Sequence, residues 1–159
     1  MTQEQKDILL KDLCARLPYG VKIALKNNGA YHHENIAKKG DVTIDILKGF
    51  NGNYFSIRHT NPLDWDWYDD DIDIEDIKPY LFPLSSMTEE QWIDTPYANL
   101  NKFTFDSFKC GCSTLAFETY EVNLSYVVEF INWCYKNHFD IYGLIPKGLA
   151  EDATGKNIY

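Results

Sequence analysis

The residues best suited to chemistry form one acidic stretch near the middle of the chain. Eight of the 24 carboxylates lie between Asp64 and Asp76, and closely spaced aspartates supply oxygens of the kind that calcium prefers. An EF-hand loop beginning at Asp64 would place Glu75 at position twelve, but position six is Asp69 where a glycine is required. A specific metal site is therefore disfavoured, and neither a metal nor a cofactor is predicted.

The same stretch also carries aromatic residues that suit a docking surface. Tryptophan and tyrosine rings are rigid, contribute contact area at low entropic cost and are frequent interface hot spots. Clustered carboxylates accelerate the encounter with a basic partner, and so many of them cannot lose water together. We therefore predict a solvent-exposed binding loop; the alternative is that the tryptophans fold back over the sheet. The predicted binding residues are Trp65, Trp67, Tyr68, Asp69, Asp70 and Asp71.

Histidines and serines offer weaker alternatives. His32 and His33 are adjacent, so on a strand they point to opposite faces and cannot easily chelate one ion. His59 and His138 could join them only through the fold. Ser85-Ser86 precedes a helix start, where a capping role explains the residues as well as an anion site does. No catalytic residue is predicted.

The four cysteines are interpreted as structural thiols. Cys110 and Cys112 have a spacing that matches no zinc motif, and no second pair of ligands follows them. Cys14 and Cys134 lie on apolar faces of predicted helices and are expected in the core. The chain has no secretory context, so reduced thiols in a cytoplasmic protein are expected.

The composition of the chain excludes some classes of protein. The 159 residues fit one domain, and 45% hydrophobic residues argue against disorder. A net charge of −9 disfavours direct binding of nucleic acid. The N-terminus lacks the apolar run of a signal peptide, and no run is long enough to span a bilayer.

The first half of the chain contains a predicted helix followed by β-strands. Thr2 and Gln5 have the spacing of a capping box, which with the apolar residues after them predicts a helix over residues 2–17. Val42, Ile44 and Ile46 alternate with polar residues, which predicts a strand with these three side chains in the core. The other predicted strands are residues 21–25, an ambiguous segment at 30–37, the return strand 54–58 after an Asn51-Gly52 turn, and a last strand at 72–77.

The second half combines helices and strands. Thr88 and Gln91 repeat the capping-box spacing, and Met87 with Trp92 fits a hydrophobic staple. A strand at 102–105 and a hairpin partner at 115–120 are expected next. The apolar tail after the last helix should pack on the body, leaving about the last eight residues mobile. That last helix, residues 124–138, has a predicted buried face made of Leu124, Val127, Val128, Ile131, Cys134 and Tyr135.

Several strings along the chain form a recognisable set: Ala15–Val21, Ile77–Leu81, Pro83–Glu90, Asn137–Asp140, Gly143–Ile145 and Gly148–Thr154. Together they resemble an uncharacterised family of small proteins from gut bacteria of the Bacteroides group and their phages or mobile elements. That family has no assigned activity, cofactor or catalytic residues. The resemblance implies only a cytoplasmic setting, a mobile-element origin and one cooperative unit. Residues 64–73 and 97–122 match none of its strings.

The sequence as a whole predicts one α+β domain over residues 1–159, with a β-rich half at 18–84 and a mixed half at 85–150. The expected fold is a small curled antiparallel sheet or an SH3-like partial barrel, packed with an N-terminal and a C-terminal helix. The expected function is non-enzymatic binding of a protein with a basic surface; the oligomeric state stays open. The alternatives are a metal-assisted hydrolase with an Asp, Glu and His site, and an acidic mimic of nucleic acid.

Overall fold

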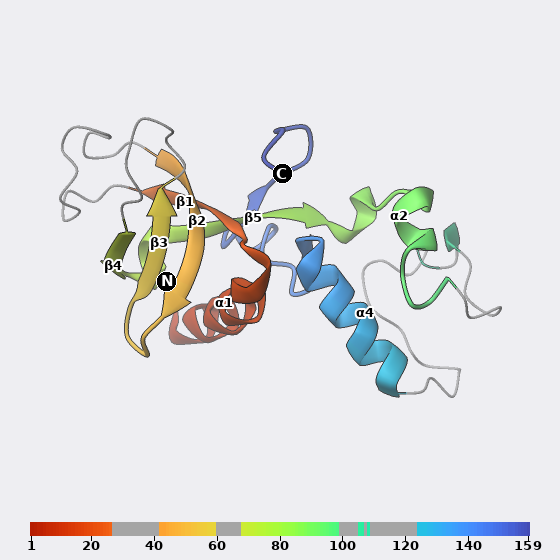
Figure 1. Cartoon of the computed structure of the whole chain (residues 1–159), viewed down its shortest axis with the longest axis horizontal. Coiled ribbons are helices and arrows are strands. Elements are labelled where there is room, and N and C mark those ends of the chain that lie inside the picture. The colour runs from red at the N-terminus through yellow and green to blue at the C-terminus, as the bar shows by residue number, and fades with distance from the viewer. Residues whose placement is uncertain (27–41, 60–67, 99–104, 107, 109–123) are drawn as a thin grey trace.

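The computed structural model describes residues 1–26, 42–59, 68–98, 105–106, 108 and 124–159 (Figure 1). Two α-helices near the ends of the chain accompany a sheet whose strands come from all parts of the sequence. The α+β class predicted from the sequence is confirmed. In chain order the elements are α1 (Gln3–Arg16), η1 (Leu17–Tyr19), β1 (Lys22–Lys26), β2 (Val42–Phe50), β3 (Phe55–His59), β4 (Tyr68–Ile72), η2 (Ile74–Asp76), β5 (Ile77–Pro83), η3 (Leu84–Ser86), α2 (Glu89–Ile93), α4 (Leu124–Lys136), β6 (Phe139–Asp140) and β7 (Glu151–Asp152).

In the described residues the sheet is mixed and open, with six strands in the order β4-β3-β2-β1-β5-β6 and a seventh, β7, also paired with β5. The strands from β4 to β5 pair antiparallel, whereas β6 and β7 run parallel to β5. The prediction of a curled antiparallel sheet or partial barrel is therefore wrong. Strand β5 pairs with two late segments of the chain, and β4 and β6 form opposite ends of the described sheet.

Helix α1 covers one face of this sheet and closes the main core. Its capping box is present as predicted: the Thr2 hydroxyl accepts from the Gln5 N–H, and the Gln5 side chain accepts from the Thr2 N–H. Leu9 and Leu13 are fully buried against strand residues such as Ile23 and Ile57. Burial of aliphatic side chains from both layers supplies the main driving force for folding here.

The face of β2 that packs on the core is not the one that its sequence pattern predicts. Asp45 and Leu47 are buried at 2% and 0% exposure, whereas Val42 and Ile44 are 59% and 38% exposed. Leu47 pairs with the buried Ile57 of β3, so the register of that hairpin selects the face. The expectation that Val42, Ile44 and Ile46 fill the core is wrong, because a shift of one residue exchanges the two faces of a strand.

A second apolar cluster lies where β5 leads towards α2 (Figure 1). The predicted capping box at Thr88 and Gln91 is present, and both Met87 and Trp92 of the predicted staple are buried. Phe105 is helical, so the strand predicted at 102–105 is wrong at that residue. The segments 30–37, 102–104 and 115–120, for which strands were predicted, lie outside the described residues.

Helix α4 confirms the predicted helix at 124–138, but its buried face is smaller than predicted. Leu124 and Val128 are 74% and 49% exposed, whereas the buried residues of the helix are Phe130, Cys134 and Tyr135. Figure 1 shows the N-terminal half of α4 projecting away from the sheet. The full predicted stripe is not buried because only the later turns reach α1 and β6.

The segment after β6 returns to the main core, as predicted. Leu144, Leu149 and Ala150 are buried in the same cluster as α1 and the sheet. The expectation that the last eight residues are mobile is wrong, because Ala153 is 2% exposed and its N–H donates to the Leu81 carbonyl at 2.8 Å. The Tyr159 hydroxyl donates to the Tyr80 carbonyl at 2.8 Å.

The orientation of β2 leads to a prediction about the stability of the protein. Leu47→Ala should lower the free energy of unfolding by about 2–5 kcal/mol, because it leaves a cavity under α1. Val42→Ala, the matched control on the same strand, should cost about 1 kcal/mol or less. Urea denaturation of both variants measures the difference; a larger loss for Val42→Ala would contradict this orientation of β2.

Candidate functional site: an acidic strand at the edge of the sheet

Four of the six predicted binding residues lie in a strand at one edge of the described sheet. Tyr68 and the three consecutive aspartates Asp69–Asp71 belong to β4, which pairs only with β3 among the described strands. The expectation that these residues form a loop is therefore wrong for residues 68–71, whose backbone alone is described. Trp65 and Trp67 lie outside the described residues.

The acidic strand is tied to the core at its end. Ile72 is fully buried and pairs with Phe55, whereas Asp69 pairs with Ile57, so the register shifts between these two positions. Such an irregularity bends and twists an edge strand locally. Ile72 therefore fixes where β4 ends and keeps the three aspartates in the edge strand.

The carboxylates after β4 have structural partners. Asp73 accepts from the Glu75 N–H at 3.1 Å and caps η2. Glu75 lies 2.6 Å from the Lys6 Nζ of α1, and this contact lowers the pKa of Glu75 and raises that of Lys6. The acidic stretch thus divides into a C-terminal part that holds the fold and an edge strand whose carboxylates remain the candidate site.

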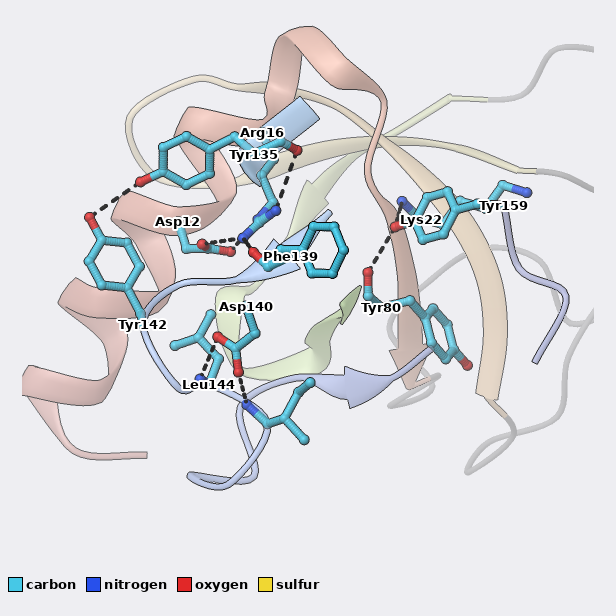
Figure 2. Close-up of polar contacts among 11 residues, drawn as sticks. Asp12, Arg16, Lys22, Tyr80, Tyr135, Phe139, Asp140, Tyr142, Leu144 and Tyr159 are labelled. Carbon is cyan, nitrogen blue, oxygen red and sulfur yellow. Dashed lines mark hydrogen bonds and ion pairs between the residues drawn. The ribbon is translucent and has the colours of Figure 1, made fainter. Parts of the chain in front are cut away.

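A buried ion pair that the sequence reasoning missed positions the helices. Arg16 and Asp12 are both fully buried on α1, with Nε to Oδ2 at 2.7 Å and Nη2 to Oδ1 at 2.9 Å (Figure 2). Arg16 also donates to the carbonyls of Phe139 at 2.7 Å and Tyr135 at 3.4 Å. Its guanidinium lies 5.0 Å from the centre of the Tyr135 ring. One side chain therefore joins α1 to the end of α4 and to β6.

The electrostatics of this pair are those of a structural contact. Burial raises the pKa of Asp12, and the hydrogen bonds from Arg16 oppose that rise. Removal of one partner would leave an unpaired charge in the core. The i,i+4 spacing of Asp12 and Arg16 is a sequence signal for an ion pair, but surface pairs show the same spacing, so burial could not be predicted from it.

Asp140, which lies beside this ion pair, also stabilises the fold. Its two carboxylate oxygens accept from the N–H groups of Leu144 at 2.8 Å and Ile145 at 2.9 Å (Figure 2). These bonds fold the segment after β6 back towards the main core, where Leu144 is fully buried. Buried backbone N–H groups need hydrogen-bond acceptors of this kind, so Asp140 has a structural role.

His138 is the titratable group with the most unusual environment among the described residues. It has φ of +60° and its ring stacks on Tyr159 with centroids 4.0 Å apart. Its Nδ1 atom is buried and has no hydrogen-bond partner among the described residues. Burial, assisted by the charges of Arg16 and Lys22, lowers the pKa of His138 to about 4. The ring is therefore neutral at pH 7.

Among the remaining sequence candidates, His59 ends β3, the strand that pairs with the acidic strand, and its backbone alone is described. Cys134 is buried, which confirms its core assignment and raises its thiol pKa to about 12, whereas Cys14 is only half-buried. Ser86 donates to the Pro83 carbonyl at 2.7 Å within the short η3 turn. The other candidates, His32, His33, Cys110 and Cys112, lie outside the described residues.

In the part of the chain that the structure describes, no three His, Cys, Asp or Glu side chains gather as they would around a metal ion. Within the same residues, none of the helices has both the length and the apolar character needed to cross a membrane. Comparisons with known protein families, with curated proteins and with solved structures gave no match.

The buried ion pair predicts that removing one partner lowers the free energy of unfolding more than replacing both. Asp12→Ala should lower the free energy of unfolding by about 3–5 kcal/mol, because it leaves Arg16 buried without its counter-ion. The double variant Asp12→Leu/Arg16→Met should recover part of that loss. Glu75→Gln, which breaks the exposed pair with Lys6, should leave the melting temperature nearly unchanged. A stable Asp12→Ala protein would contradict the structural role.

His138 predicts a loss of stability in acid. The unfolded chain takes up the imidazole proton near pH 6.5, whereas the folded chain does so only near pH 4. The stabilisation that comes from keeping His138 neutral is therefore complete above pH 6.5. It is lost as the pH falls towards 4, by about 3 kcal/mol at most. His138→Asn removes the titration, and asparagine tolerates the positive φ. The gap in unfolding free energy between wild type and His138→Asn should change across this window; a constant gap would contradict the assignment.

Proposed function

We propose that this protein is a non-enzymatic binding protein that docks a basic protein segment along the acidic edge strand β4. The observation that carries the proposal is the position of Asp69–Asp71 in β4, which forms one end of the sheet among the described strands. An edge strand presents backbone N–H and C=O groups that another strand can pair with. Peptide recognition by strand addition uses such edges, with backbone bonds for affinity and side chains for specificity.

The three aspartates favour one kind of partner. Consecutive carboxylates at the edge repel acidic strands and make pairing with a neutral strand less favourable, because they lose water without gaining a counter-ion. A lysine- or arginine-rich segment supplies those counter-ions. The proposed aromatic anchors, Trp65, Trp67 and Tyr68, precede the aspartates directly in the chain and would add the contact area that hot spots require.

The edge strand is also supported by the core in a way that suits a docking surface. Ile72 anchors its end at full burial, and the Asp73 side chain caps the short helical turn that follows. A surface held in place before binding loses less conformational entropy when the partner arrives. The alternatives of a metal-assisted hydrolase and of a nucleic-acid mimic gain no supporting observation from the described residues.

Binding of a defined basic peptide tests the proposal. A fluorescent peptide of alternating lysine and valine should bind the full chain at low salt, and Asp69→Asn/Asp70→Asn/Asp71→Asn should weaken its affinity about tenfold. Fluorescence anisotropy measures the change, and salt should reduce the difference between the proteins because the Debye length shrinks.

A charge-matched variant provides the control. Glu4→Gln/Glu90→Gln/Glu129→Gln removes three negative charges from exposed positions outside the edge strand, so it changes the net charge equally. It should bind the lysine–valine peptide with nearly the wild-type affinity. Equal weakening by both triple variants would show that only net charge matters, and would overturn the proposed site.

A further inference from the structure

Residues 154–159, which we call the strap, lie on the side of β1 and β5 that faces away from α1. Ile158 of the strap packs on Ala24, Tyr80 and Ala153, a cluster separate from the main core. The residues on either side of Ala24 in β1 belong to the main core beneath α1. Because side chains alternate along a strand, Ala24 and the strap lie on the other face of the sheet.

The Tyr159 hydroxyl continues the hydrogen bonding between β1 and β5. At this end of the two strands the register stops with Ile23 opposite Pro79. The next pair in the same register would be Lys22 opposite Tyr80. The Lys22 N–H donates to the Tyr159 hydroxyl at 3.1 Å, and that hydroxyl donates to the Tyr80 carbonyl at 2.8 Å (Figure 2). One strap side chain therefore satisfies a backbone donor of β1 and a backbone acceptor of β5.

Few other contacts hold the strap. Its first four residues are exposed, and Lys156 lies 3.6 Å from Glu151 in an exposed pair that contributes little stability. The Lys22 ammonium donates to the Ile158 carbonyl. The main core contains no residue of the strap, so loss of these contacts would leave the main core intact.

The ring of Tyr159 lies against the imidazole of His138. The two rings are nearly parallel, at 11°, with centroids 4.0 Å apart. The φ of His138 is +60°, a left-handed conformation that few side chains adopt, and its carbonyl accepts from the Phe82 N–H at 2.9 Å. The backbone of His138 is thus fixed to β5 with its ring against the strap.

The surroundings of His138 favour the neutral ring. Its Nδ1 atom has no partner among the described residues, so a protonated ring would hold a buried donor without an acceptor. Arg16 of α1 and Lys22 of β1 oppose a further positive charge. The carboxylates of Asp12 on α1 and Asp140 on β6 already accept from Arg16 and from backbone N–H groups. An aromatic face attracts a cation, but in a parallel stack the Nδ1 hydrogen points past the ring.

We infer that the strap is released by acid: protonation of His138 detaches residues 154–159 from β1 and β5 while the main core stays folded. Release gives water access to the imidazolium and removes the Tyr159 hydroxyl from between the two strands. It also uncovers Ala24 and Tyr80, which are each 7% exposed with the strap in place. The inference is independent of the proposed function, because it uses no residue of β4.

Acid favours release because only the open form binds the proton readily. A solvated histidine takes up its proton near pH 6.5, whereas the pKa of His138 beneath the strap is lowered to about 4. The closed form is therefore favoured most above pH 6.5, and this preference is lost as the pH falls towards 4. Between pH 7 and about pH 4.5 the ratio of open to closed strap should rise about fiftyfold.

Hydrogen exchange of the full chain, resolved by residue with NMR, separates release of the strap from global unfolding. The Lys22 and Lys156 amides report on the strap, because they donate to the Tyr159 hydroxyl and to the Ala153 carbonyl. The Leu47 amide reports on the main core. At about pH 4.5, relative to intrinsic rates, the two lysine amides should exchange at least about tenfold faster than that of Leu47. Low urea should hardly change their exchange, because release exposes little surface. Equal protection and equal urea dependence at all three amides would overturn the inference.

A variant without the imidazole assigns the release to His138. In the wild type the protection of Lys22 and Lys156 should fall about fiftyfold between pH 7 and about pH 4.5. His138→Asn cannot take up the proton and tolerates the positive φ, so its protection should fall far less. It keeps Glu151 and Asp152, whose contacts with the strap also respond to acid. Circular dichroism checks that the variant is folded, and the urea comparison on the wild type does not depend on it. An equal fall in both proteins, or no fall in the wild type, overturns the inference.

Discussion

The buried ion pair of Asp12 and Arg16 is the contact on which the arrangement of this protein depends. Arg16 joins α1 to the carbonyls of Tyr135 and Phe139, and thereby connects the main core with the cluster around α4. The same helix carries Lys6, which contacts Glu75 in the turn after the acidic strand, but this pair is exposed and adds little stability. The buried guanidinium therefore fixes α1 against the end of α4 and β6, and the edge strand is held to the core by Ile72.

Charge is distributed unevenly over this framework. The net charge of −9 suggests a uniformly acidic molecule, yet Lys26 is exposed at the end of β1 and Lys78 pairs with Glu151 on β5, while the edge strand contains Asp69–Asp71. Separated patches of opposite sign guide encounter and orientation more effectively than the net charge does. The run of aspartates in the edge strand is what supports the proposed docking of a basic segment.

Local signals in the sequence predicted local structure well. The capping boxes at Thr2 and Thr88 form as expected because their hydrogen bonds join residues only three apart. The Asn51-Gly52 turn also forms: the Asn51 side chain accepts from the N–H groups of Asn53 and Tyr54, and Gly52 adopts φ of +100°. These features depend on neighbouring residues and are therefore readable without knowledge of the fold.

Features set by distant contacts could not be predicted in this way. The alternating side chains of β2 would allow either face of the strand to pack on the core. The pairing of Leu47 with Ile57 selects the less apolar face. The open sheet results from parallel pairing of β5 with segments about sixty and seventy residues later, for which no local pattern exists. Arg16 was missed because a charged side chain is rarely fully buried unless it is paired. For the candidate site, the residue types indicated the acidic stretch, but its place in an edge strand required the structure.

Hydrogen–deuterium exchange of the full chain, with and without the lysine–valine peptide, tests the docking surface most directly. Amides of an edge strand exchange readily until a partner pairs with them. If β4 is the docking surface, the peptide should slow exchange in residues 68–72 and leave the exposed N-terminal turns of α4 unchanged. Slower exchange confined to α4, or no change in β4 at saturating peptide, would contradict the proposed function.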